Sequence, residues 1–195
     1  YTPPSGCFKT TIVTINPIPS ANGGVTSLCV GATGSVTNTT SGGVSWISSN
    51  TSVATVGVTS GVVTGVAAGT ATITYNVNTG CYTTSVVTVN PVPAAFTGTL
   101  SVCAGSATSL STTTTGGTWS SSYVAIASVG SSTGVVTGVS GGTAVISYVL
   151  STGCSRTAVV TINATPNAGT ISGSIYNLNT VSWPTSVTLM TNGTT

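Results

Sequence analysis

The sequence predicts an all-β protein made of tandem small antiparallel β-sandwiches, and two observations carry this prediction. Gly, Ser, Thr, Val and Ala dominate the 195 residues, and β-branched residues suit a pleated, half-buried surface. In addition, a long stretch from Val44 to Tyr75 recurs from Thr118 to Tyr148. A recurrence of this length indicates one folded unit that is used twice.

The two copies are in register along their length. Four matched pairs are each 73 residues apart: Trp46 and Trp119, Gly61 and Gly134, Tyr75 and Tyr148, and Cys81 and Cys154. We therefore expect repeat 1 at residues 20–93 and repeat 2 at residues 94–166. Residues 1–19 are predicted to be the last strand of a preceding repeat, and residues 167–195 the start of a third, incomplete repeat. Because no signal peptide is visible at the start, we expect a piece of a longer chain.

Each repeat is predicted to hold about seven short strands. Turn residues occur every eight to twelve positions, which is typical of a small β-sandwich. The strands expected in repeat 1 are Val25–Val30, Ser35–Thr39, Gly43–Ser48, Ser52–Val56, Val62–Val66, Thr70–Val77 and Thr83–Asn90. Repeat 2 is expected to carry their equivalents.

A shared motif ends each repeat. GCFKTTIVTINPIP near the N-terminus matches GCYTTSVVTVNPVP at residues 80–93 and GCSRTAVVTINATP at residues 153–166. Apolar and polar residues alternate within the motif, which predicts a last strand with one buried face. The prolines then end the strand, since proline donates no backbone hydrogen bond. The short linkers that follow are expected to be stiff.

Four aromatic residues are the candidates for the centre of the two cores. Trp46 and Trp119 open the long recurring stretch and are expected to lie between the sheets of their sandwiches. Tyr75 and Tyr148 close the stretch and are expected to pack from a late strand with the hydroxyl toward the rim.

Charged residues are almost absent, and this limits the possible chemistry. Lys9 and Arg156 are the only charged side chains, and the sequence contains no Asp, Glu or His. Such a chain lacks the groups of a Ser-His-Asp triad, of a glycosidase carboxylate pair and of a calcium site. Two separate cations make no nucleic-acid surface, and no apolar run reaches membrane-spanning length. We therefore predict no enzyme activity, no cofactor, no metal and no membrane insertion.

The recurring stretch resembles the bacterial immunoglobulin-like repeats of group 2, which occur in invasin- and intimin-type adhesins. In repeat 1 the residues that carry the resemblance are WISSN at 46–50, VATV at 53–56, GVVTGV at 61–66 and AGTATI at 68–73. The flanking VCxG and GC elements are similar to those of long surface repeat proteins of Bacteroidota. The resemblance implies Ig-like sandwiches in a secreted, extracellular stalk, adhesin or filament at the cell surface. It brings no catalytic residues.

The cysteines recur in register and are expected to form structural disulfides in an oxidising compartment. The expected pairs lie within a repeat, Cys29 with Cys81 and Cys103 with Cys154, and Cys7 would pair with an upstream partner. Each such bond would add roughly 4 kcal/mol in the chain-entropy model. Cross-repeat pairs, Cys7 with Cys29 and Cys81 with Cys103, are the alternative, and free thiols are a third option. A metal site is not expected, because Cys-x-x-Cys and His are both missing.

Together these observations favour a structural role. The chain is predicted to be a repeat segment of a cell-surface adhesin or extracellular filament that gives length, mechanical strength and surface attachment. Expected partners are copies of itself or neighbouring repeats in a fibre, with surface polysaccharide as a further candidate. The alternative is an accessory spacer or carbohydrate-binding module of a secreted enzyme. That role would need an exposed aromatic platform, for which the candidates are Phe8, Tyr82, Phe96, Tyr123 and Trp183.

Overall fold

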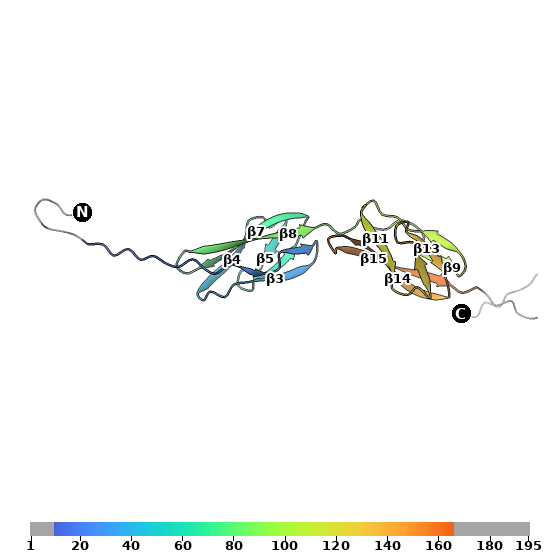
Figure 1. The fold of residues 1–195 in the computed structure, drawn as a ribbon, viewed down its shortest axis with the longest axis horizontal. Helices are drawn as coiled ribbons and strands as arrows, with labels where there is room; N and C mark the ends of the chain where they lie inside the picture. The colour runs from blue at the N-terminus through green and yellow to red at the C-terminus, as the bar shows by residue number, and fades with distance from the viewer. Residues whose placement is uncertain (1–9, 166–195) are drawn as a thin grey trace, which may run out of the picture. The chain divides into compact units, whose positions relative to one another are not determined.

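The protein folds into two β-sandwiches, which confirms the predicted fold class. The computed structural model describes residues 10–165, and its fifteen strands fall into two groups, β1 to β8 and β9 to β15 (Figure 1). Within residues 10–165 no helix is long and apolar enough to cross a membrane. Residues 1–9 and the incomplete repeat predicted at 167–195 lie outside the described part.

The first sandwich consists of two four-stranded sheets. One has the strand order β2-β8-β7-β4 and the other β1-β3-β6-β5. The strands are β1 (Gly23–Gly24), β2 (Ser27–Cys29), β3 (Thr33–Thr37), β4 (Gly43–Ser48), β5 (Ala54–Val56), β6 (Val62–Gly65), β7 (Gly69–Val77) and β8 (Tyr82–Asn90).

The second sandwich repeats this arrangement. Its sheets have the orders β11-β14-β15-β9 and β10-β13-β12, and an isolated bridge from Thr97 to Ser111 stands where the first sandwich pairs β1 with β3. The strands are β9 (Ser101–Cys103), β10 (Ala107–Ser109), β11 (Gly117–Ser121), β12 (Ala127–Val129), β13 (Val135–Gly138), β14 (Gly142–Leu150) and β15 (Ser155–Asn163).

The long strands β7 and β14 explain why the sequence alternates as it does. Along β7 every second side chain, from Ala71 through Ile73 and Tyr75 to Val77, is buried, and the intervening residues are only partly covered. Successive side chains of a strand point to opposite faces, so one face of β7 enters the core. Each sandwich buries its own apolar cluster in this way, one centred on Trp46 and the other on Trp119.

The first strand of each repeat differs from the prediction. In place of the single strand expected at Val25–Val30, the structure has β1, which precedes that range and pairs with β3, and the shorter β2, which pairs with β8 in the other sheet. Gly24 ends β1 at φ +93°, and a Cβ on it would lie 2.2 Å from the Ser35 carbonyl oxygen, so only glycine fits here.

The pairing of β2 with β8 is parallel, as is that of β9 with β15, and each is the one parallel pair of an otherwise antiparallel sandwich. The three residues of β2 pair with Thr88–Asn90, so the whole of β2 lies beside the end of β8, and Cys29 stands opposite Asn90.

A bulge in β4 explains a change in the repeat spacing. Cys29 and Cys103 are 74 residues apart, whereas Trp46 and Trp119 are 73 apart. The extra residue of repeat 1 lies between Gly43 and Ser45, where the register of β4 against β7 shifts. An extra residue in one strand of an antiparallel pair is accommodated as a β-bulge. The matching strand β11 pairs with β14 without a shift.

The described part of the predicted N-terminal strand, residues 10–19, contains no strand. Ile12 and Ile15 are 93% and 90% exposed, because no neighbouring strand lies beside them. The segment contacts repeat 1 at Asn16, whose carbonyl oxygen lies 3.8 Å from the Cys81 sulfur, and at its end, where Pro19 is buried and the Ser20 N–H donates to Thr40 Oγ1 (2.8 Å).

Candidate functional site

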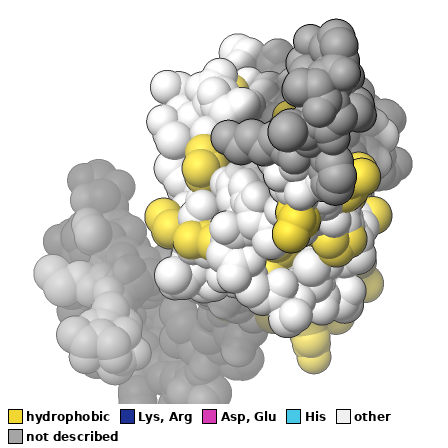
Figure 2. Space-filling model, turned by 90° about the vertical axis from the view of Figure 1, so that its left-hand side faces the viewer, with side chains coloured by type: hydrophobic (Ala, Val, Ile, Leu, Met, Phe, Trp, Pro, Cys, Tyr) yellow, Lys and Arg dark blue, Asp and Glu magenta, His cyan; other side chains and the backbone are white. Residues whose placement is uncertain are grey.

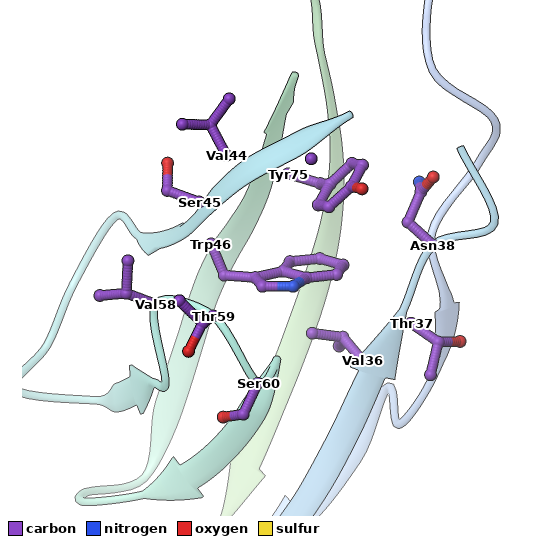
Figure 3. A pocket seen from close by; sticks show the side chains of 11 residues that line it. Val36, Thr37, Asn38, Val44, Ser45, Trp46, Val58, Thr59, Ser60 and Tyr75 are labelled. Carbon is purple, nitrogen blue, oxygen red and sulfur yellow. The ribbon is translucent and has the colours of Figure 1, made fainter. Parts of the chain in front are cut away.

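A pocket of about 350 Å³ opens beside Trp46 in the first sandwich. Figure 3 shows the indole between β4 and the residues around Val36, with Thr59 and Ser60 below it and Tyr75 above. The Trp46 and Tyr75 rings pack with centroids 4.6 Å apart, and the Tyr75 hydroxyl donates to the Thr40 carbonyl (2.7 Å).

The indole of Trp46 packs against a position that must be glycine. Gly61 adopts φ +67°, and a Cβ on it would lie 2.5 Å from the Val36 carbonyl oxygen and 3.2 Å from the Trp46 ring. Gly134 holds the same relation to Trp119 at φ +70°. A glycine is therefore needed at both positions, since any side chain would enter the space that the tryptophan fills.

Repeat 2 carries an equivalent pocket of about 360 Å³ beside Trp119. Here Tyr148 accepts a hydrogen bond from the Gly117 N–H (2.8 Å), and Phe96 packs on the Trp119 ring at a centroid distance of 4.7 Å. Repeat 1 has Asn22 at the position of Phe96, where it accepts a hydrogen bond from the Asn38 side chain. Both pockets are thus lined by a Trp–Tyr pair, and the Trp119 ring has an aromatic neighbour, Phe96, that Trp46 lacks.

Neither pocket presents the aromatic platform that a carbohydrate-binding role requires. Trp46 and Trp119 are each only 6% exposed, so their ring faces are covered by the core. Of the candidates for a platform, Tyr82 and Tyr123 are 60% exposed but belong to different repeats, and Phe96 packs against Trp119. Phe8 and Trp183 lie outside the described residues.

The second candidate site is a disulfide between the two repeats. Cys29 at the end of β2 is bonded to Cys154 in the hairpin between β14 and β15, with the Cα atoms 5.7 Å apart and 125 positions apart in sequence. Cys154 is buried, and its carbonyl accepts from the Leu150 N–H (2.9 Å), which fixes the hairpin. The bond links β2 of repeat 1 to the β14–β15 hairpin of repeat 2.

This bond corrects the pairing expected from the sequence. The pairs predicted within a repeat, Cys29 with Cys81 and Cys103 with Cys154, are wrong, and so are the alternative pairs of Cys29 with Cys7 and Cys81 with Cys103. The physical reason is that the end of β2 and the β7–β8 hairpin, which holds Cys81, lie at opposite ends of the same sheet. Cys81 and Cys103 are free thiols, and Cys7 lies outside the described residues.

Repeat 2 makes a further contact with the end of repeat 1. The Arg156 Nε–H donates to the carbonyl oxygen of Pro93 (2.6 Å), and Pro93 is fully buried. The Cys154 sulfur lies 4.0 Å from the Asn90 carbonyl oxygen. The disulfide and the Arg156 hydrogen bond therefore both connect repeat 2 to the end of repeat 1, where the linker begins. Sequence reasoning missed this role of Arg156; the signal was that Lys9 and Arg156 occupy the same position of the shared terminal motif.

The surface offers little for ionic recognition. On the face in Figure 2, the described surface consists of uncharged polar atoms with scattered apolar side chains. Among residues 10–165, no group of three or more His, Cys, Asp or Glu side chains could hold a metal ion.

The comparisons with known proteins agree with the architecture. Residues 9–89 match the family described as the bacterial Ig-like domain (group 2), which confirms the resemblance carried by the Trp46 stretch. No curated protein is similar enough to the chain to count as a match.

Several solved structures are similar to the chain. A C-terminal intimin fragment, solved in complex with the intimin-binding domain of the translocated intimin receptor, is 18% identical with a TM-score of 0.45. The match covers 77% of this chain and 65% of the fragment. Invasin, a bacterial integrin-binding protein, is 17% identical with a TM-score of 0.45, over 77% of this chain and 40% of invasin. Domains 1–6 of the surface layer protein SbsC are 21% identical with a TM-score of 0.28, over 68% of this chain and 23% of that chain. The chain thus spans less than two thirds of each of these proteins.

Proposed function

Because residues 9–89 match the bacterial Ig-like domain (group 2), we propose that the chain is a load-bearing repeat segment of a secreted cell-surface adhesin or extracellular filament. In this role it supplies length and mechanical strength between other parts of the protein, at the cell surface, and performs no catalysis. Neighbouring repeats and further copies of the chain are its partners, and surface polysaccharide is a candidate contact of the polar faces.

The observation that carries this proposal is the bond between the repeats. A disulfide within a domain stabilises that domain alone, whereas Cys29–Cys154 joins two domains by a second covalent path besides the linker. A closed loop of this size lowers the free energy of the folded pair relative to the unfolded chain by roughly 5 kcal/mol in the chain-entropy model. Such a connection makes the two repeats harder to separate by a pulling force.

The strand arrangement supports the same role. In the reduced protein, a force on the two chain ends of repeat 1 acts along β2 and β8, which are parallel and adjacent, so their hydrogen bonds are loaded together. The flanking bonds run from the Val30 N–H to the Asn90 carbonyl and from the Thr88 N–H to the Thr26 carbonyl, both 2.9 Å. The pair β9 and β15 carries equivalent bonds from Ala104 and Thr161.

The alternative, a carbohydrate-binding module of a secreted enzyme, has less support. It requires an aromatic ring face open to a sugar, and the two tryptophans of the described part are buried. A passive spacer in such an enzyme would share the mechanical properties proposed here.

The proposal is tested by stretching the reduced protein between its ends with an atomic force microscope. We expect two separate unfolding events of similar length, one for each sandwich. The substitution Val30→Pro removes the donor to Asn90 and should lower the unfolding force of one event only; Ala104→Pro is the matched variant for the other repeat. An unchanged force in both variants would contradict a load-bearing role of the terminal strands. Antibodies against the folded segment should label intact cells of the source bacterium.

A further inference from the structure

We propose that Cys81 and Cys103 are two further halves of the same kind of inter-repeat disulfide, and that each takes its partner from an adjoining repeat. Each junction whose two repeats carry these cysteines would then be closed by one covalent bond. The inference rests on the proposed role as a string of repeats, and it concerns covalent connectivity rather than force.

The four described cysteines fall into two structural classes. Cys29 and Cys103, the strand-end cysteines, close β2 and β9 and stand opposite Asn90 and Asn163 in the parallel ladders. Their carbonyls accept from the N–H three residues on, at 2.9 Å for Cys29 and 3.0 Å for Cys103. Cys29 and Cys103 therefore have the same backbone surroundings.

Cys81 and Cys154, the hairpin cysteines, follow glycines with nearly equal geometry. Gly80 has φ +83° and Gly153 has φ +84°. The Cys81 carbonyl accepts from the Val77 N–H at 3.0 Å, and the Cys154 carbonyl accepts from Leu150 in the same way. Because the two hairpins have the same backbone geometry, the sulfur atoms of Cys81 and Cys154 occupy equivalent positions in their repeats.

The observed bond gives the rule for pairing the two classes. It joins the strand-end cysteine of the earlier repeat, Cys29, to the hairpin cysteine of the later repeat, Cys154. By the same rule Cys103 pairs with the hairpin cysteine of a following repeat. Cys81 pairs with the strand-end cysteine of a preceding repeat.

A second contact places Cys81 at such a junction. Its sulfur lies 3.8 Å from the Asn16 carbonyl oxygen, as the Cys154 sulfur lies 4.0 Å from that of Asn90. Asn16 and Asn90 each begin the Asn-Pro-x-Pro motif, and the final proline of each motif, Pro19 or Pro93, is buried. The chain that enters repeat 1 thus passes Cys81 as the linker passes Cys154.

Both thiols can react. Cys103 is exposed and Cys81 is half-buried, and neither is bonded. Formation of each new bond removes one proton and one electron from each of two thiols. A small-molecule disulfide such as oxidised glutathione accepts them and leaves as two thiols, by way of a mixed disulfide.

The first test places a following repeat in the chain. A second copy of residues 94–166 is inserted directly after Pro166 in a Cys7→Ser background, the protein is folded in a glutathione redox buffer, and its non-reduced peptides are mapped by mass spectrometry. We expect Cys103 to be linked to the inserted copy's hairpin cysteine and to be protected from alkylation. In the matched control, Cys154→Ser in the inserted copy alone, that protection should be lost. Alkylation of Cys103 in the extended chain, or its linkage to the inserted strand-end cysteine, would overturn the proposal.

The second test asks whether another copy can supply the partner. Cys81→Ser and Cys103→Ser variants of the 195-residue chain, both with Cys7→Ser, are oxidised alone and as a mixture. A covalent dimer that forms in the mixture only supports pairing between the two classes across copies. A dimer of one variant alone would refute the rule. If the mixture stays monomeric while the extended chain pairs, the rule holds and the partner comes from the same chain. Neither result alters the unfolding events expected for the mechanical role.

Discussion

The Cys29–Cys154 bond should set how far the protein can be stretched. With the bond intact, tension passes from Cys29 directly to Cys154, so the chain between them carries no load. These residues are 125 positions apart, and an extended chain spans about 3.5 Å per residue, so the bond withholds about 430 Å of extension. The strands β2 and β15, which lead into the two cysteines, stay under load.

Single-molecule stretching of the oxidised protein, compared with Cys29→Ser/Cys154→Ser, measures this difference directly. We expect the double variant to lengthen by about 430 Å more than the oxidised protein when both sandwiches have unfolded. Cys81→Ser/Cys103→Ser is the matched control, because it removes two cysteines and leaves the bond, and it should behave as the unaltered chain. Equal final lengths for the oxidised protein and the Cys29→Ser/Cys154→Ser variant would refute the assignment of this disulfide.

Two further predictions concern stability. Because the sequence has no Asp, Glu or His, the folded and unfolded chains should bind the same number of protons through acidic pH, and calorimetry should give a constant unfolding temperature from about pH 4 to about pH 7; a steep loss of stability on acidification would contradict this. Gly61→Ala should destabilise repeat 1 in urea by more than the roughly 1–2 kcal/mol that a left-handed conformation costs a residue with a Cβ, because its methyl group also meets the Val36 carbonyl. Gly80→Ala is the matched control, with φ +83° but open space, and equal losses for both variants would show that the contact beside Trp46 is not tight.

The near-absence of charge gives the single contact of Arg156 more weight than a surface arginine usually has. Its guanidinium has no acidic side chain to pair with anywhere in the sequence, and it donates to a backbone carbonyl in the linker instead. A hydrogen bond from a charged donor is stronger than a neutral one. The position of the rare charge at the junction agrees with the view that the junction, rather than the pocket, is the functional feature of this chain.

The sequence by itself determined the fold class and the residues that alternate between core and surface. Local patterns are sufficient for this, because a strand with one buried face must place every second residue inside, as β7 does with Ile73 and Tyr75. The register of the repeat likewise identified Trp46 and Trp119 as equivalent, and the structure places both in their cores.

Only the tertiary structure decided which cysteines meet. Sequence spacing shows that Cys29 and Cys81 recur, but a disulfide needs Cα atoms within about 7 Å, and that distance depends on which pole of a sandwich each cysteine occupies. The division of the first strand and its parallel pairing with β8 place Cys29 at the pole where the linker leaves. No local pattern encodes that change of sheet, because it depends on pairing with β3 on one side and with β8, far along the chain, on the other. The bond between the repeats follows from that placement.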